Sequence, residues 1–228
     1  MKLATLLSGG KDSLYATYLA KKEHEISVII TMKSENSESY MFHVPNIDLV
    51  KLQAESMKVP LIFKTTKGVK EEELTDLKQA LVEAKKKYGI EGVISGAIFS
   101  EYQRSRIQKI CNELNIKSIT PLWKNKPGQL WKEMIEAGFD IIIVAVAAGG
   151  LEKEWLGKKI DKQAVFELTK LNETCYVCTG FEGGEAESLV LSCPLFERRI
   201  EILDFEIKWD NKTESGEMII KKARLSSS

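Results

Sequence analysis

The sequence has no long hydrophobic run, few cysteines and no excess charge of either sign. Its longest uncharged apolar stretch, 141–148, is far shorter than the roughly 20 residues of a transmembrane helix, so no membrane span is expected. The apolar stretch before residue 8 is too short for a signal-peptide core, so export is not expected. Four irregularly spaced cysteines do not make a disulfide framework, which indicates a reducing cytoplasm.

Charge and composition narrow the class of protein further. The 33 lysines and arginines oppose 33 aspartates and glutamates, so no global positive field would draw the chain onto nucleic acid or anionic lipid. A hydrophobic fraction of 43% is typical of a folded globular protein and excludes wholesale disorder. The length of 228 residues fits one large domain or two modest ones, and it leaves a homo-oligomer open.

Short apolar runs alternate with amphipathic stretches over the first half of the chain. Strands are expected at 3–7, 26–31, 61–64, 92–95 and 118–120, with helices near 12–22, 47–57, 71–88 and 103–115. Helical crossovers force neighbouring strands to run parallel, so this half predicts a doubly wound α/β sheet with helices on both faces. Ligands of such sheets bind at the carboxyl ends of the strands.

A turn-rich stretch at 124–128 divides the chain into two predicted domains, 1–123 and 124–228. The second is expected to be a smaller α+β domain. Its helices are predicted near 129–137 and 161–171, its strands at 140–147, 189–191, 200–207 and 218–222, and a glycine-rich acidic loop at 180–185.

Two of the predicted helices carry further information. In the helix near 103–115, an apolar stripe of Ile107, Ile110, Cys111 and Leu114 should face the core. Gln103 begins that stripe, so this end of the helix either faces a cleft or meets water. The charge runs 71–73 and 85–87 are expected on solvated faces of another helix.

The segment Ser8-Gly9-Gly10-Lys11-Asp12-Ser13, called the 8–13 loop below, follows the first predicted strand and opens the first helix. Its glycines permit a sharp turn, and the free N–H groups of the new helix favour an anion such as phosphate. Ser8 and Ser13 add hydroxyl donors, Lys11 adds a positive charge and Asp12 could hold Mg²⁺. The two common nucleotide-binding motifs, G-x-x-x-x-G-K-S/T and G-x-G-x-x-G, are absent here. The alternative is an ordinary strand-to-helix turn.

The 8–13 loop resembles the PP-loop of the N-type ATP pyrophosphatases. Members of that superfamily cleave ATP between the α and β phosphates and leave AMP on their substrate. The resemblance implies an adenine nucleotide alpha-hydrolase-like fold of the HUP type.

Further stretches narrow the resemblance to the diphthine–ammonia ligases. They are 40–43, 95–98 with 101–106, 120–123 and, most specifically, Glu182-Gly183-Gly184-Glu185-Ala186-Glu187-Ser188. The resemblance implies that the chain uses ATP, Mg²⁺ and ammonium to amidate diphthine on translation elongation factor 2, in the cytoplasm. An acyl-adenylate would form, and AMP and pyrophosphate would be released. Phe181 departs from the family pattern, which often has another glycine there.

The nucleotide site that the resemblance implies is built mainly on the 8–13 loop. Lys11 and Asp12 are expected to take part in catalysis, with Asp12 holding the metal. The expected nucleotide contacts are Ser8, Gly9, Gly10, Lys11, Asp12, Ser13, Thr31, Met32, Gly96 and Ala97. For Gly96 the alternative is a simple turn that ends a strand.

A second group of residues is expected to bind the carboxylate or phosphate of the reacting molecules. It comprises Tyr102, Gln103, Arg104 and Arg106, with Arg104 also assigned to catalysis. Ordinary surface arginines are the alternative. His43 follows a polar segment, 33–40, that could close over the site, but a lone histidine is more often structural, and that interpretation is favoured.

The acidic motif is expected to bind a cation of the substrates, through Glu182, Gly183, Gly184, Glu185 and Glu187, with Glu185 among the catalytic residues. Clustered carboxylates repel one another unless a cation lies nearby, and diphthine carries a trimethylammonium group. A solvated acidic turn is the alternative. Cys175 and Cys178 have metal-ligand spacing, but no second pair completes a zinc site.

Two other functions compete with this hypothesis. A PP-loop tRNA-thiolating enzyme could use Cys175 and Cys178 to carry sulfur, but the neutral charge and the lack of a basic appendage argue against direct nucleic-acid binding. A sensor that holds ATP without turning it over is the other alternative.

Overall fold

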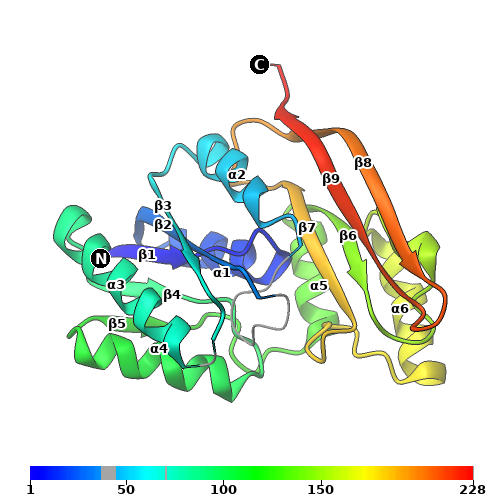
Figure 1. The fold of residues 1–228 in the computed structure, drawn as a ribbon, viewed down its shortest axis with the longest axis horizontal. Coiled ribbons are helices and arrows are strands. Elements are labelled where there is room, and N and C mark those ends of the chain that lie inside the picture. The colour runs from blue at the N-terminus through cyan, green and yellow to red at the C-terminus, as the bar shows by residue number, and fades with distance from the viewer. Residues whose placement is uncertain (37–44, 70, 228) are drawn as a thin grey trace. The chain divides into compact units, whose positions relative to one another are not determined.

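The computed structural model describes residues 1–36, 45–69 and 71–227, which fall into two compact units, Met1–Lys124 and Asn125–Ser228 (Figure 1). Each unit has a sheet of its own. Within the described residues, no helix combines the length and the apolar character that a bilayer crossing requires.

The first unit is a five-stranded parallel sheet, which confirms the predicted α/β class, and its strand order is β3-β2-β1-β4-β5 (Figure 1). Its strands are β1 (Lys2–Leu6), β2 (Glu25–Ser34), β3 (Leu61–Thr66), β4 (Gly92–Ile94) and β5 (Lys117–Ile119). Its helices are α1 (Lys11–Lys21), the 3₁₀ turn η1 (Ile47–Leu49), α2 (Val50–Met57), α3 (Glu72–Tyr88) and α4 (Glu101–Glu113). Because the chain builds outward from β1 to β3 and then returns to β4, the switch in strand order lies beside β1, where such sheets bind ligands.

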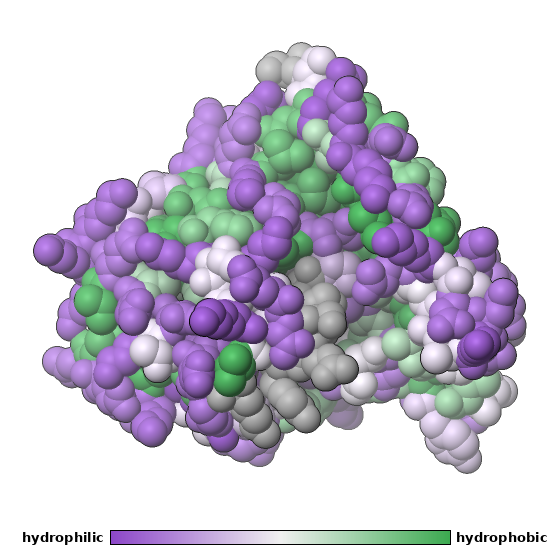
Figure 2. Space-filling view, viewed as in Figure 1, coloured by the Kyte–Doolittle hydropathy of each residue, from purple (hydrophilic) through white to green (hydrophobic). Residues whose placement is uncertain are grey.

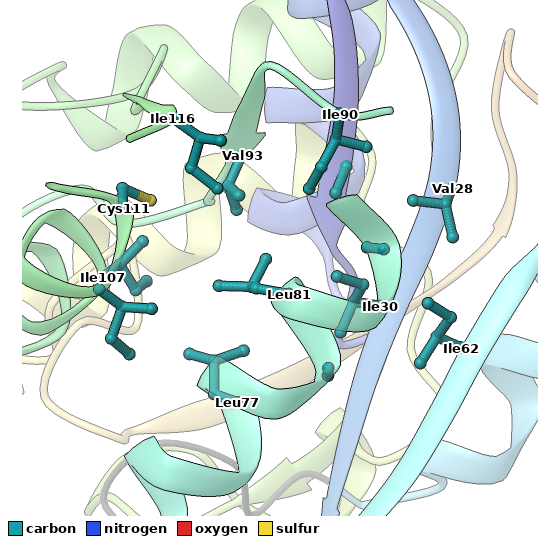
Figure 3. Packing of buried hydrophobic residues seen from close by; sticks show 14 of the residues in the cluster. Val28, Ile30, Ile62, Leu77, Leu81, Ile90, Val93, Ile107, Cys111 and Ile116 are labelled. Atoms are coloured by element: carbon teal, nitrogen blue, oxygen red, sulfur yellow. The ribbon is translucent and has the colours of Figure 1, made fainter. Parts of the chain in front are cut away.

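Helices α3 and α4 cover one face of this sheet (Figure 3). Leu77 and Leu81 of α3 belong to the same buried cluster as Ile30 of β2, while Ile107 and Cys111 of α4 supply the predicted inward stripe. The outer surface of these helices is mostly hydrophilic (Figure 2).

The expectation that all of 71–73 lies on a solvated face was wrong for one residue. Glu73 is fully buried at the start of α3, whereas Glu71, Glu72 and the run 85–87 are exposed. The position follows from helix geometry, because Glu73 and Leu77 are four residues apart and so share the inward face of α3.

The second unit is a four-stranded antiparallel sheet in the order β7-β6-β9-β8, accompanied by helices, and this confirms the α+β prediction. Its strands are β6 (Asp140–Val146), β7 (Ala186–Ser192), β8 (Ile200–Asp210) and β9 (Ser215–Leu225). Its helical segments are α5 (Pro127–Glu136), the 3₁₀ turn η2 (Lys153–Trp155) and α6 (Lys162–Cys175).

Candidate functional site

The 8–13 loop links β1 to α1 at the carboxyl edge of the parallel sheet. Gly9 has a φ of +87°, which a residue with a side chain rarely adopts. Gly10 caps α1 with extended backbone and no side-chain hydrogen bond. Within the described part of the chain, the N–H groups of Gly9, Gly10 and Asp12 donate no hydrogen bond. The loop therefore offers several backbone donors and a helix N-terminus to an anion.

The Ser13 hydroxyl holds the two ends of the loop together. It accepts a hydrogen bond from the N–H of Ser8 at 3.2 Å and donates to the carbonyl of Gly10 at 3.1 Å. It also lies 3.1 Å from the hydroxyl of Ser8. These bonds shape the loop, a role that the sequence prediction did not include for the two serines.

Lys11 and Asp12 form a partly buried ion pair at the start of α1. The Lys11 ammonium is 2.6 Å from Asp12 Oδ2, and the side chain of Lys11 is only 5% exposed. Asp12 Oδ1 is buried and has no hydrogen-bond partner within the described residues. Burying a carboxylate oxygen without a partner is costly, so this donor set fits a hard cation such as Mg²⁺.

Buried threonines support the loop from below. Thr17 of α1 donates to the carbonyl of Ser13 at 2.7 Å and shares a 2.6 Å hydrogen bond with Thr5 of β1. Thr31 of β2 donates to the carbonyl of Leu7 at 2.8 Å. The hydroxyl of Thr31, expected near the nucleotide, thus fixes the chain as it enters the loop. Sequence reasoning missed Thr5 and Thr17.

Of the other residues expected around the nucleotide, Ala97 and Met32 are buried and Gly96 is half-buried. Gly96 packs against the loop itself, since a Cβ there would lie 2.7 Å from the Ser13 nitrogen and 2.8 Å from the Asp12 carbonyl carbon. Ala97 is buried, and Met32 belongs to the hydrophobic cluster beneath α3. The close approach that glycine permits at position 96 is therefore an approach to the backbone of the loop.

Gln53 of α2 also contacts the loop, although the sequence analysis did not single it out. Its side chain is fully buried, and its Nε2 donates to the carbonyl of Gly9 at 3.1 Å. A signal was present in the sequence. Gln53 lies at i+3 from Val50 and is followed by Ala54 and Met57, so an amide interrupts the inward stripe of α2.

The two arginines of α4 point to different partners. Arg106 pairs with Glu71 at 3.0 Å and stacks on the ring of Tyr102 at 3.8 Å, while the Tyr102 hydroxyl also donates to Glu71 at 3.2 Å. Burial and the Glu71 carboxylate raise the pKa of Tyr102, and the bond with Glu71 raises the pKa of Arg106. Arg104 lies over the ring of Trp123 at 4.7 Å.

The structure therefore divides the expected anion-binding group of α4, since Tyr102 and Arg106 lie together beside Glu71 while Arg104 lies over Trp123. Within the described chain, no hydrogen bond or ion pair joins Arg104 or Arg106 to the 8–13 loop. Gln103 is half-buried in the first turn of α4, and its N–H is capped by the Ser100 hydroxyl. His43 and the stretch 40–43 lie outside the described residues.

In the second unit, Glu185 shapes the acidic loop. One carboxylate oxygen accepts from the N–H of Cys178 at 3.1 Å, and the other accepts from the N–H of Gly183 at 2.8 Å. The carbonyl of Glu185 accepts from the N–H of Ala147 at 2.8 Å. The Glu185 carboxylate therefore bridges two backbone N–H groups and fixes the shape of the loop. Hydrogen bonding of this kind offsets the repulsion that clustered carboxylates would otherwise create.

Phe181, which replaces the expected glycine, adopts a glycine-like backbone. Its φ is +63°, while its ring is buried and packs edge-on against Trp131 of α5 at a centroid distance of 5.8 Å. Trp131 Nε1 also donates to the carbonyl of Thr179 at 2.6 Å. The loop that the sequence left uncertain in shape is thus anchored on α5.

The remaining acidic and sulfur groups do not form a metal centre. Glu182 is exposed and Glu187 is half-buried on β7. Cys175 is exposed at the end of α6 and Cys178 is half-buried. Across 1–36, 45–69 and 71–227, no group of three or more His, Cys, Asp or Glu side chains could hold a metal ion.

Two family models together match most of this chain. The model of the diphthamide synthase N-terminal domain matches residues 1–118, and that of the diphthamide synthase C-terminal domain matches residues 126–225.

Curated relatives named diphthine–ammonia ligase are similar over most of the sequence. Those of Bos taurus and Homo sapiens are each 33% identical over 91% of this chain and 85% of the relative. That of Schizosaccharomyces pombe is 32% identical over 98% of this chain and 39% of the relative. A solved structure, called the predicted subunit of tRNA methyltransferase from Methanocaldococcus jannaschii, has a TM-score of 0.42 and 18% identity, covering 85% of this chain and 98% of its own.

Proposed function

The chain belongs to the diphthamide synthase family, and from this membership we propose its reaction in detail. It is a diphthine–ammonia ligase that amidates a carboxylate at the expense of ATP. In our proposal the acceptor is the diphthine residue of translation elongation factor 2, the nitrogen comes from ammonium, and the product is diphthamide. We place the reaction in the cytoplasm.

The chemistry requires activation of the carboxylate. A carboxylate does not react with ammonia at neutral pH because its leaving group would be oxide. If its oxygen attacks the α-phosphorus of ATP, pyrophosphate leaves and an acyl-adenylate forms, from which ammonia displaces AMP. The protein has to orient the two reactants, stabilise the charge that grows on the phosphates and exclude water.

The observation that carries this proposal is a set of backbone N–H groups in the 8–13 loop that donate no hydrogen bond within the described residues. They lie beside the Lys11–Asp12 ion pair. The loop would hold the phosphates, and Lys11 would balance their negative charge. Asp12, through its buried Oδ1, would hold Mg²⁺, which supplies Lewis-acid stabilisation of phosphate charge when bound. The residues that we assign to the nucleotide are Ser8, Gly9, Gly10, Lys11, Asp12, Ser13, Thr31, Met32, Gly96 and Ala97.

The remaining predicted site residues are assigned to binding of the protein substrate. Tyr102, Gln103, Arg104 and Arg106 are proposed to bind its carboxylate. Glu182, Gly183, Gly184, Glu185 and Glu187 are proposed to form the region for its trimethylammonium group. Because both oxygens of Glu185 are bonded to loop N–H groups, Glu185 would act by fixing the loop, while Glu182 supplies exposed negative charge.

The test is incubation of the protein with ATP, ammonium and diphthine-bearing elongation factor, followed by mass analysis of the modified residue. The proposal expects conversion of the acid to the amide, dependent on all three reactants. A salt-sensitive complex with tRNA and sulfur transfer would instead indicate the thiolating enzyme. Binding of ATP without turnover of any acceptor would indicate a sensor.

A further inference from the structure

We propose that Gln53 is a positioning residue that aims the backbone N–H of Gly10 at the bound triphosphate. The inference rests on the proposed use of ATP at the 8–13 loop. It assigns a role in that site to α2, a helix that contributes none of the motif residues.

The first observation is the burial of an amide where an apolar side chain would suffice. Gln53 is fully buried on the inward face of α2, in line with Val50, Ala54 and Met57. A buried amide is costly unless it is hydrogen-bonded, and a methionine of similar size would pack there without that cost. The bond from Nε2 to the carbonyl of Gly9 at 3.1 Å offsets part of this cost, and it is a contact that an apolar side chain could not make.

The second observation concerns the peptide that Gln53 holds. The carbonyl of Gly9 and the N–H of Gly10 belong to one planar trans peptide, in which the two groups point in opposite directions. When Gln53 draws the carbonyl toward α2, the N–H of Gly10 has to point away from α2. In the described part of the chain, that N–H donates no hydrogen bond. It is thus directed outward and available to a ligand.

The third observation shows that the peptide has alternatives that must be suppressed. Gly9 has a φ of +87°, and glycine explores more backbone conformations than any other residue. In an unrestrained loop, the carbonyl of Gly9 could accept from the N–H of Ser13 and extend α1 by one hydrogen bond. Side chains of α2 also pack closely against Gly9, because a Cβ on Gly9 would lie 3.2 Å from Gln53 Oε1 and 3.3 Å from Val50 Cγ2.

The test compares Gln53→Met with the wild-type chain. Methionine keeps the length of the side chain and removes the donor. We expect the affinity for α,β-methylene-ATP with Mg²⁺, measured by calorimetry, to fall about 10- to 100-fold, as for loss of one aligned donor to a charged group. Gln108→Met is the matched control, because Gln108 is a half-buried glutamine of α4 whose side chain bonds to Asn112 on the same helix. Its affinity should equal that of the wild type.

The outcomes are distinguishable. Unchanged nucleotide affinity in folded Gln53→Met would overturn the inference and leave the proposed function intact. A wild-type chain that binds the analogue but amidates nothing would overturn the proposed function alone, whereas failure of the wild type to bind it would overturn both. If Gln53→Met does not fold, Gln53→Leu removes the same donor without adding a charge, and the same loss is expected. A lower melting temperature with unchanged affinity would show that the role is merely structural.

Discussion

Gly96 lies directly against Ser13, so that a single added carbon on Gly96 would stand 2.7 Å from the Ser13 backbone nitrogen. Neither partner can easily yield, since Gly96 follows β4 and Ser13 lies in the first turn of α1. The 8–13 loop is thus held in place by the segment that follows the neighbouring strand β4, across the switch in strand order. This contact links the shape of the loop to residues far away in the sequence.

The substitution Gly96→Ala should therefore damage the nucleotide site. We expect a stability loss of about 1–3 kcal/mol from overpacking, and a nucleotide affinity at least about tenfold weaker because the loop is displaced. Calorimetric titration with α,β-methylene-ATP measures the affinity, and urea unfolding measures the stability. Gly128→Ala is the control, because no atom lies within 4 Å of its added Cβ. An affinity equal to the wild type in Gly96→Ala would contradict the contact.

Lys11→Ala should lower turnover by about 10²–10³ or more, because a preorganised charge beside the phosphates is lost. The Lys11 side chain is almost wholly buried next to Asp12, so the variant must also be shown to be folded by circular dichroism. Release of AMP is the readout. Lys21→Ala serves as the control, since Lys21 is exposed in the last turn of the same helix. Near-normal turnover of Lys11→Ala would reject its assignment.

At position 181, a glycine variant is expected to be more stable than an alanine variant. Removing the Phe181 ring should cost about 3–5 kcal/mol, because the contact with Trp131 is lost. At a φ of +63°, glycine should then be better than alanine by about 1 kcal/mol, the reverse of the order at ordinary backbone angles. Urea unfolding of Phe181→Gly and Phe181→Ala checks this. An alanine variant as stable as the glycine variant would show that the left-handed backbone is not retained.

The raised pKa of the Cys111 thiol predicts that the fold loses stability at alkaline pH. Burial raises the pKa of this thiol from 9.0 to about 11, against a smaller opposing effect of Ser118. A pKa raised in the folded state stabilises the fold below the unfolded pKa, and that stabilisation is lost as the pH rises from about 9 through 11. The wild type should lose about 2–3 kcal/mol more than Cys111→Ala over this range.

The measurement for Cys111 is the free energy of unfolding at several pH values in both proteins. The comparison cancels the titration of lysines and tyrosines that the two proteins share. Parallel curves for the two would contradict the prediction. Alkylation provides a second check, since the exposed Cys175 should react in the folded protein while Cys111 should not.

The 8–13 loop could be predicted from the sequence because its determinants are local. Two glycines, a lysine and an aspartate between a strand and a helix fix both the turn and its chemistry. The support beneath the loop could not be predicted in the same way. Gln53 reaches Gly9 across 44 positions of sequence, and the interrupted apolar stripe of α2 indicates a buried amide without indicating its partner.

The partners of the two arginines of α4 could not be predicted from the sequence. Arg104 and Arg106 were predicted to act as one group, yet residues two apart on a helix do not face each other. In the structure, one lies over Trp123 and the other pairs with Glu71. The acidic motif was likewise predicted by its charge, but its shape depends on Trp131 of α5 and on hydrogen bonds that loop N–H groups donate to the Glu185 carboxylate. The contacts of Arg106 with Glu71 and of Phe181 with Trp131 join segments that are distant in the sequence.

The central claim is that the 8–13 loop holds ATP so that the bond between the α and β phosphates is the one that breaks. The most direct measurement uses ATP labelled at the α-phosphate, with ammonium and diphthine-bearing elongation factor, and identifies the labelled nucleotide formed as the amide accumulates. The account predicts AMP in equal amount to the amide, and none when diphthine is withheld. Labelled ADP formed in step with the amide would contradict it.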